Sequence, residues 1–412
     1  MEPLVQKLIA EIRAAGLKAP AKILFGVGSA AQLEPLAREL AAGRPVFIVT
    51  APFLAAQAEA LLRGLPGEVF ARVEGEPTIA LADAVAAQAR QLKPGLIISL
   101  GGGSVMDTGK AVAALAVNSG SVRDYLEGLG SRTALDAAPL PHIAVPTTAG
   151  TGAEATRNAV IAAPDAGVKR SMRFDGMLPA VALLDPALTL SVPQAATAAG
   201  GLDTLTQLIE VCISAKRKPA VTALALQALR LVRAALPVCC DDPRNLEARS
   251  AMMLASFVSG VGLANSGLAM AHGIAAALGA LHDVPHGLAC GILLPATLRY
   301  NRAACEPELA AALAAFLNLD AEAVAAHYER RRRPQAAATE ADVIKTGIAE
   351  IEQLQRRIGV PGDLRHLKLD AVALEKIAAG SMGSSMSGNP VPMTPEATFA
   401  FLRTIGCPRI NE

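Results

Sequence analysis

Residues 96–117 read LIISLGGGSVMDTGKAVAALAV, and the fold class of the chain can be inferred from them. The first five residues are a continuous apolar run, which is typical of a strand buried on both faces of a sheet. Three glycines and Ser104 follow directly, and the rest has the pattern of a helix. A buried strand that passes through a short turn into a helix is the building unit of α/β proteins with a parallel sheet.

The same alternation of strands and helices runs through the first 190 residues. Strands are expected at Ile23–Phe25, Val46–Thr50, Glu68–Val73, His142–Val145 and Ala180–Leu184. Helices are expected between them at Ala55–Arg63 and Ile79–Leu92. Beyond Val192 the pattern is almost entirely helical, with helices expected at Gly201–Ser214, Ala220–Ala235, Leu246–Leu263 and Ala269–Gly279. We therefore predict an α/β domain with a parallel sheet over residues 1–190 and an all-helical domain over residues 191–412.

Composition excludes several classes of protein. Of the 412 residues, 52% are apolar and 18% charged, which is typical of a well-packed globular chain. A net charge of +1 gives no reason to expect a nucleic-acid or membrane partner. We interpret the one basic run, Arg330–Arg333, as a solvated helix end, with a phosphate or RNA site as the alternative. The six scattered cysteines, the lack of a signal-peptide pattern and the lack of a long uncharged apolar run predict a cytoplasmic protein.

Two loops after strands carry candidate ligand-binding residues. Gly101, Gly102, Gly103 and Ser104 precede a helix, whose N-terminal N–H groups and dipole suit a phosphate or pyrophosphate. By itself this turn is a weak signal, since in GxGxxG the last glycine would fall at Met106. Residues 146–156, PTTAGTGAEAT, gather hydroxyls and glycines where open α/β sheets bind ligands. A loop capped by its own threonines is the alternative.

The helical half contains a candidate metal site. Asp203 follows a glycine pair at the apparent start of a helix, and His272 and His286 lie in the apolar stretch 270–295. One aspartate and two histidines from separate helices can bind a divalent metal and leave a position open. For any one of the three, a buried polar residue satisfied by hydrogen bonds is the alternative.

Motifs from both halves occur together in one known family. They are FGVGS at 25–29, GGGSVMDTGK at 101–110, PTTAGTGAEAT at 146–156, LLDPALT at 183–189, GGLDTLTQLIE at 200–210, PHG at 285–287 and NPVPMT at 389–394. In order and spacing, over nearly the whole chain, these motifs resemble the iron-containing (group III) alcohol dehydrogenases, which have the dehydroquinate synthase-like fold. The resemblance implies a metal-dependent, NAD(P)-linked alcohol dehydrogenase or aldehyde reductase that acts on a small alcohol or aldehyde, and a homodimer.

The resemblance also implies roles for particular residues. The NAD(P) pyrophosphate would lie on Gly101–Ser104, and the cofactor groove would be lined by Asp107, Thr147, Thr148, Thr151 and Lys169. The ligands of Fe(II) or Zn(II) would be Asp203, His272 and His286. The metal would polarise the alcohol or carbonyl oxygen as a Lewis acid while hydride passes between carbon and nicotinamide.

Three positions depart from the family pattern. The family's metal set is one aspartate and three histidines, and Gln207 occupies the position one helical turn after Asp203. This leaves two interpretations, a looser metal site with Gln207 as a poor ligand or substrate contact, and a site that has lost its metal. Ala276 replaces a histidine of the proton relay, for which His282 is the candidate substitute and a loop residue bonded to backbone the alternative. Thr50-Ala51 replaces an aspartate that repels the 2′-phosphate, so NADP(H) is expected to be tolerated or preferred.

Other functions remain open at this point. A dehydroquinate synthase-like cyclase would need a basic phosphate pocket, for which Lys216-Arg217-Lys218 is the compact candidate. A maleylacetate reductase-like enzyme would need cationic groups for two carboxylates, which the sequence does not identify. Gln207 and Ala276 also motivate a catalytically silent paralogue that binds a nucleotide or a partner.

Overall fold

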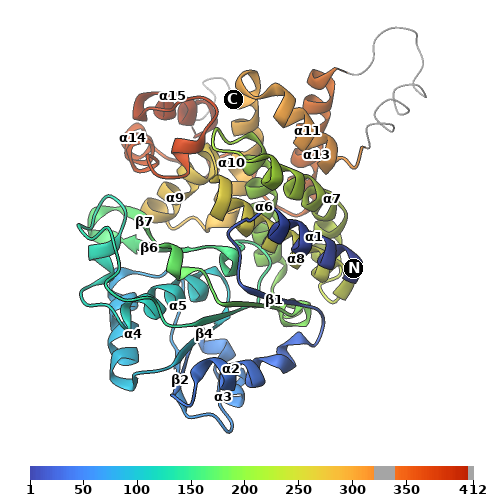
Figure 1. Cartoon of the computed structure of the whole chain (residues 1–412). Coiled ribbons are helices and arrows are strands. Elements are labelled where there is room, and N and C mark those ends of the chain that lie inside the picture. Colours follow the sequence, from blue (N-terminus) through green and yellow to red (C-terminus); the bar gives the residue numbers. More distant parts are fainter. Residues whose placement is uncertain (320–338, 407–412) are drawn as a thin grey trace. The chain divides into compact units, whose positions relative to one another are not determined.

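The computed structural model describes residues 1–319 and 339–406, and the basic run Arg330–Arg333 lies outside them (Figure 1). The chain divides into two compact units, Met1–Val192 and Pro193–Glu412. The first contains a parallel sheet with helices and the second is helical, so the predicted fold class is confirmed.

The first unit is built on a six-stranded sheet in which every strand pair is parallel. The strand order is β1-β8-β5-β4-β2-β3. The strands are β1 (Lys22–Phe25), β2 (Val46–Thr50), β3 (Gly67–Ala71), β4 (Leu96–Gly101), β5 (His142–Pro146) and β8 (Val181–Leu184). The helices of this unit are α1 (Glu2–Ala14), α2 (Leu33–Ala41), α3 (Ala55–Leu61), α4 (Ile79–Leu92) and α5 (Gly103–Leu115).

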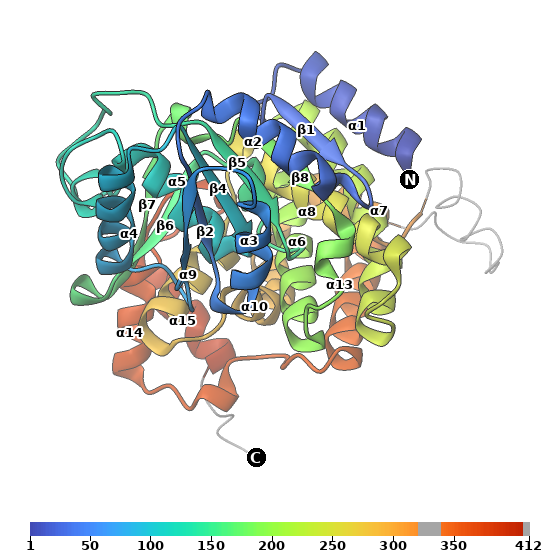
Figure 2. The ribbon, with the colours of Figure 1, turned by 90° about the horizontal axis from the view of Figure 1, so that it is seen from below.

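Alternate residues of the central strands pack against different helices. Val46 and Ile48 pack with residues of α2 and α3, whereas Phe47 and Val49 pack with residues of α4 and α5. Figure 2 shows these helices beside the strands of the sheet. Side chains alternate along a strand, so a strand covered on both faces must be apolar throughout. This is the physical reason why the continuous apolar runs in the sequence identified these strands.

The strand order reverses direction between β2 and β4. After β2 the chain passes to β3 at the sheet edge, and after β4 it passes to β5 on the other side. Ligands of open α/β sheets bind at the carboxyl ends of the strands that flank such a reversal. Gly101 ends β4 and Thr50 ends β2, and both therefore lie at the position where a nucleotide is expected.

The first unit also contains an antiparallel hairpin that the sequence did not indicate. It consists of β6 (Asn158–Ala163) and β7 (Val168–Arg173). Strand β7 reads VKRSMR, and its three cationic residues obscure the period-two pattern of a half-buried strand. The hairpin is held to α5 by Asp107, whose Oδ2 accepts a hydrogen bond of 3.0 Å from the Val160 N–H.

The second unit consists of helices packed around α6. They are α6 (Gln194–Ile213), α7 (Pro219–Asp241), α8 (Leu246–Ser266), α9 (Met270–His282), α10 (His286–Asn301), α11 (Glu306–Phe316), α13 (Glu340–Arg357), α14 (Ala371–Gly380) and α15 (Pro395–Gly406). Within the described residues, α7 is long and apolar enough to cross a membrane. It packs against α6 and α8, and 56% of its most apolar window is buried, as expected for a core helix.

The predicted start of α6 at Gly201 was wrong. The helix begins at Gln194, so the glycine pair lies inside it and Asp203 lies near its middle. A Cβ atom at position 201 would lie 2.2 Å from Leu236 Cδ1 of α7. Gly201 is therefore required by close packing of two helices and does not mark a helix terminus.

Candidate functional site

Four side chains from three helices form a candidate metal centre in the second unit. They are Asp203 of α6, His272 of α9, and His286 and Cys290 of α10. One ligand atom from each lies within 4.8 Å of the corresponding atoms of the other three. The structure thus brings together the three ligands suggested by the sequence and adds a thiol, which sequence reasoning had missed. The signal for it was the spacing of four residues from His286 to Cys290, which puts both on one helix face.

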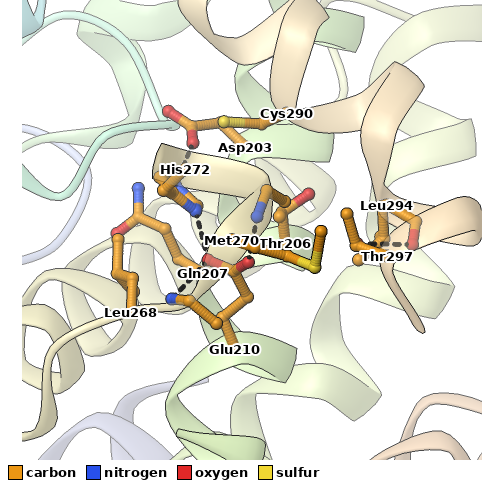
Figure 3. A network of polar contacts seen from close by, with 12 residues as sticks. Asp203, Thr206, Gln207, Glu210, Leu268, Met270, His272, Cys290, Leu294 and Thr297 are labelled. Carbon is orange, nitrogen blue, oxygen red and sulfur yellow. Dashed lines mark hydrogen bonds and ion pairs between the residues drawn. The ribbon is translucent and has the colours of Figure 1, made fainter. Parts of the chain in front are cut away.

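His272 lies between two carboxylates (Figure 3). Its Nε2 is 3.1 Å from Asp203 Oδ1, and its Nδ1 is 2.7 Å from Glu210 Oε2. Glu210 accepts two further hydrogen bonds from backbone N–H groups, so the Nδ1–H of His272 donates to it as well. Nε2 faces Asp203 and, once deprotonated, can present its lone pair to a cation. Histidines that bind a metal through one ring nitrogen usually donate the N–H of the other to a carboxylate, which fixes the orientation of the ring.

Glu210 also holds the N-terminus of α9. Its two oxygens accept hydrogen bonds from the Ala269 N–H at 3.0 Å and the Ala271 N–H at 2.7 Å. These N–H groups have no partner within the helix, and Ala269 supplies no capping side chain of its own. Glu210 was not identified from the sequence, although it lies seven residues after Asp203, on the same face of α6.

The motif NPVPMT supplies the remaining cap of α9. Asn389 Oδ1 accepts a hydrogen bond of 3.2 Å from the Met270 N–H. The Asn389 amide also exchanges two hydrogen bonds of 2.8 Å with Asn301 of α10. One residue therefore ties together the helices that carry His272 and His286.

The charge states favour a compact cluster. Burial alone would lower the pKa of His286, but the nearby Cys290 sulfur and Asp203 carboxylate raise it to about 9. Burial would also lower the pKa of His272, but the neighbouring Cys290, Glu210 and Asp203 raise it well above its usual value. The pKa of Asp203 is lowered despite burial, by His286 and then His272. The neighbouring groups therefore favour the protonated forms of both histidines, and a bound cation would compete with these protons.

Gln207 is buried on α6 one turn after Asp203. Its Oε1 accepts a hydrogen bond of 3.4 Å from Ser259 Oγ. A hydrogen bond from Gln207 also helps to lower the pKa of Asp203, and only the amide NH₂ can donate to a carboxylate. Gln207 thus turns its donor toward Asp203 and its acceptor toward α8.

His282 is not brought into this group. It is an exposed residue in the last turn of α9, ten residues after His272, which corresponds to about 15 Å along the helix axis. Direct proton transfer between His282 and the four clustered side chains is therefore not supported by their placement in this unit.

Replacing Glu210 with glutamine should weaken metal binding without removing a ligand. The carboxylate of Glu210 accepts hydrogen bonds from three donors, and the amide NH₂ of glutamine would place a donor against one of them. His272 would then lose its fixed orientation. We expect affinity for Zn(II) to fall by about 10- to 100-fold, measured by competition with a chromophoric chelator. The exposed Glu375→Gln variant is the control and should bind as the unmodified protein does; equal affinities for all three proteins would contradict the role of Glu210.

The glycine turn of the first unit packs against the threonine-rich loop. A Cβ atom at Gly102 would lie 3.3 Å from Thr148 Oγ1, and one at Gly103 would lie 2.8 Å from Thr151 Cγ2. The Thr147 N–H donates to the Gly101 carbonyl at 2.9 Å. The first hydrogen bond of α5 runs from the Met106 N–H to the Gly102 carbonyl, which leaves the preceding N–H groups at the helix N-terminus without helical partners.

Asp107 and Lys169 take part in ion pairs of this unit. Asp107 Oδ1 lies 2.8 Å from Nζ of the fully buried Lys110. Lys110 also donates to the Ala153 carbonyl at 3.0 Å and to Thr156 Oγ1 at 2.8 Å. Lys169 lies 2.9 Å from Glu76 Oε1. Lys110 thus connects α5 to the threonine-rich loop, a role that the sequence did not reveal.

Glu154, in the same loop, gives a pH-dependent prediction. Burial raises its pKa from 4.5 to about 7. Because the folded-state pKa lies above the unfolded value, ionisation destabilises the fold progressively between pH 4.5 and 7, and the loss is complete above pH 7. Glu154→Gln should therefore raise the free energy of unfolding at pH 8, by at most about 3 kcal/mol, and change it little at pH 4.5. Urea unfolding at the two pH values tests this, and an equal change at both would contradict it.

The whole chain is similar to proteins of one known family. A glycine turn suited to a dinucleotide and a metal-ligand group on helices define a metal-assisted, nucleotide-dependent class of oxidoreductase. The family model for iron-containing alcohol dehydrogenase matches residues 20–186, and that for the Fe-containing alcohol dehydrogenase family, C-terminal, matches residues 197–406. The chain belongs to the iron-containing alcohol dehydrogenase family, and it is an oxidoreductase that acts on CH–OH groups.

Individual relatives extend the comparison. The chain is 36% identical to long-chain-alcohol dehydrogenase 1 of Geobacillus thermodenitrificans (strain NG80-2) over 292 residues, 69% of this chain and 73% of the relative. An alcohol dehydrogenase structure from Oenococcus oeni is 28% identical with a TM-score of 0.85, covering 94% of this chain and 99% of that one. Sulfoacetaldehyde reductase from Bifidobacterium kashiwanohense in complex with NAD⁺ is 28% identical with a TM-score of 0.78, covering 94% and 97%.

Proposed function

We propose that the protein reduces a small aldehyde, or oxidises the corresponding alcohol, with NAD(P)(H) as hydride carrier and a divalent metal held by Asp203, His272 and His286. One observation carries the proposal: the three ligand side chains converge from α6, α9 and α10, and Glu210 orients His272 through its Nδ1. The donor set of one carboxylate and two imidazoles fits Fe(II) or Zn(II). When bound, the metal supplies a Lewis acid that polarises the substrate oxygen.

The chain's own residues prepare this chemistry. Asp203 supplies the fixed negative charge that holds a cation in a buried place, where its side chain is 2% exposed. His286 is the more accessible ligand, with a side chain 32% exposed, so the face it borders is the one open to substrate. Gln207 acts as a positioning residue for Asp203. His282 stays a candidate for proton transfer to bulk water, not for direct contact with the ligands.

The cofactor is assigned to residues 1–190 and the metal and substrate to residues 191–412. Gly101–Gly103 carry no side chains, and the N–H groups before Met106 have no partner within α5, so Gly101–Ser104 fits a pyrophosphate. Thr147, Thr148 and Thr151 border the turn and offer hydroxyls. Asp107 and Lys169 remain candidate cofactor contacts in addition to their ion pairs.

The choice between NAD and NADP depends on the end of β2. Thr50 is buried and its Oγ1 donates to the Leu100 carbonyl at 2.7 Å, and Ala51 is apolar. Neither residue supplies the carboxylate that would repel a 2′-phosphate. We therefore propose that NADP(H) is tolerated alongside NAD(H), or preferred to it.

A cyclase of the dehydroquinate synthase type is less well supported. In the basic triplet, Arg217 forms an ion pair with Glu308, and Lys216 Nζ donates to Ser387 Oγ at 2.5 Å. These two cations are therefore already engaged.

We further propose that the protein is a cytoplasmic homodimer. The five described cysteines are all free and buried, which suits a reducing compartment. The dimer is proposed from the family resemblance.

The test pairs metal analysis with turnover. Protein purified without oxygen is assayed for iron and zinc, and oxidation of NADPH and NADH is followed with a panel of small aldehydes before and after chelation. The proposal predicts near-stoichiometric metal and steady-state turnover that is lost on chelation and restored by Fe(II) or Zn(II). Turnover unaffected by complete metal removal would overturn the Lewis-acid role. Absence of metal and of turnover across the panel would favour a silent paralogue.

A further inference from the structure

We propose that the Cys290 thiolate is the fourth protein ligand of the metal, and that this sulfur makes the site select Zn(II) over Fe(II). The inference rests on the proposed metal site and adds to it a residue that lies outside the Asp and His ligand set that the family resemblance implies. Soft thiolate ligands combined with nitrogen ligands in a tetrahedral arrangement favour zinc.

The position of the sulfur fits metal coordination. Cys290 Sγ lies 3.7 Å from His286 Nε2, His286 Nε2 lies 3.9 Å from Asp203 Oδ1, and His272 Nε2 lies 3.1 Å from the same oxygen. Zinc binds oxygen and nitrogen at about 2.0–2.2 Å and sulfur at about 2.3 Å, so the ligand atoms of a tetrahedral site lie about 3.3–3.7 Å apart. These three distances lie within about 0.2 Å of that range, and the other pairs of ligand atoms lie within 4.8 Å, so side-chain movements would let the group close on an ion.

Gln207 leaves a place for a fourth ligand. Its amide oxygen lies toward Ser259 Oγ of α8, at 3.4 Å, and its amide NH₂ faces Asp203, so α6 contributes one ligand atom where the family pattern has two. Cys290 approaches from α10, one turn after His286. The thiol thus restores four protein ligands, and a substrate oxygen would enter as a fifth by the expansion that catalytic zinc sites undergo.

The other described cysteines show that Cys290 is distinct. Cys212, Cys239, Cys240 and Cys305 are also buried, but in the described part of the chain none of them belongs to a ligand group. Cys305, for example, donates its thiol to the Asn301 carbonyl at 3.3 Å. A buried thiol is usually inert packing, whereas the sulfur of Cys290 faces two imidazoles and a carboxylate.

The test uses cobalt as a spectroscopic substitute in the full-length protein. Metal is removed with a chelator, Co(II) is added, and the near-ultraviolet sulfur-to-cobalt charge-transfer band is recorded together with the visible ligand-field bands. We expect the charge-transfer band in the unmodified protein and in Cys305→Ser, and its loss in Cys290→Ser with the ligand-field bands retained. X-ray absorption of the zinc form should show one sulfur at about 2.3 Å. In competition titrations, the preference for Zn(II) over Fe(II) should fall at least 10-fold in Cys290→Ser.

The outcomes separate this inference from the proposed function. Tight cobalt binding without a charge-transfer band, or a band that persists in Cys290→Ser, overturns ligation by Cys290 and leaves the metal-dependent dehydrogenase intact. Failure of the unmodified protein to bind cobalt, zinc or iron overturns both. Circular dichroism of each variant checks that the fold is retained, and Cys290→Ala provides a second variant if the serine protein does not fold.

Discussion

Asp203→Asn is expected to lower kcat/KM for aldehyde reduction by about 10³-fold and to leave the purified protein deficient in metal. The substitution keeps the shape of the side chain but removes the only carboxylate in the ligand group, and with it several kcal/mol of interaction with a cation. A loss of about 4 kcal/mol corresponds to roughly three orders of magnitude in rate. Metal content by elemental analysis and steady-state kinetics with saturating Zn(II) measure the two effects.

A matched control exists in the same unit. Asp283 is exposed between α9 and α10 and has a φ of 53°, a conformation that asparagine tolerates well. Asp283→Asn should therefore keep normal metal content and turnover. If Asp203→Asn also kept both, the assignment of the metal centre would be wrong.

Gly103→Val should abolish productive cofactor binding. A Cβ atom added at this position would lie 2.8 Å from Thr151 Cγ2, and the branched valine side chain would cover the N–H groups at the start of α5. Losing two charge-assisted hydrogen bonds to a pyrophosphate removes about 3–6 kcal/mol, or about 10²- to 10⁴-fold in affinity. Fluorescence titration with NADPH and NADH measures the dissociation constants, and metal content should be unchanged.

The control is another glycine-to-valine substitution, at a position that has open space around its backbone. A Cβ atom at Gly362 would meet nothing within 4 Å, and the backbone of this residue does not require a positive φ. Gly362→Val should bind both nucleotides as the unmodified protein does. Normal nucleotide affinity in Gly103→Val would show that the cofactor binds elsewhere on the chain.

Local sequence was sufficient for the architecture of the first unit. Strands such as Val46–Thr50 and Leu96–Gly101 are covered by helices on both faces, so burial makes nearly every residue apolar, and the buried hydroxyls of Thr50 and Ser99 form hydrogen bonds. Such a run can be recognised without knowledge of its neighbours. The hairpin Asn158–Arg173 was missed because its polar residues hide the alternation. Gly201 was misread as the start of a helix because a close helix contact and a helix end both favour small residues.

For the candidate metal centre, the sequence alone determined the residue types with unusual chemistry: one aspartate and two histidines in otherwise apolar helices. Only the tertiary structure decided which other groups join them. Glu210, Cys290 and Asn389 look like ordinary helix or loop residues, and their roles depend on contacts with residues up to 119 positions away along the chain. It also separated His282 from the group, although this histidine is close in sequence to His286. A spacing of residues fixes which face of a helix a side chain occupies, whereas the packing of α6, α9 and α10 against one another fixes which of those faces meet.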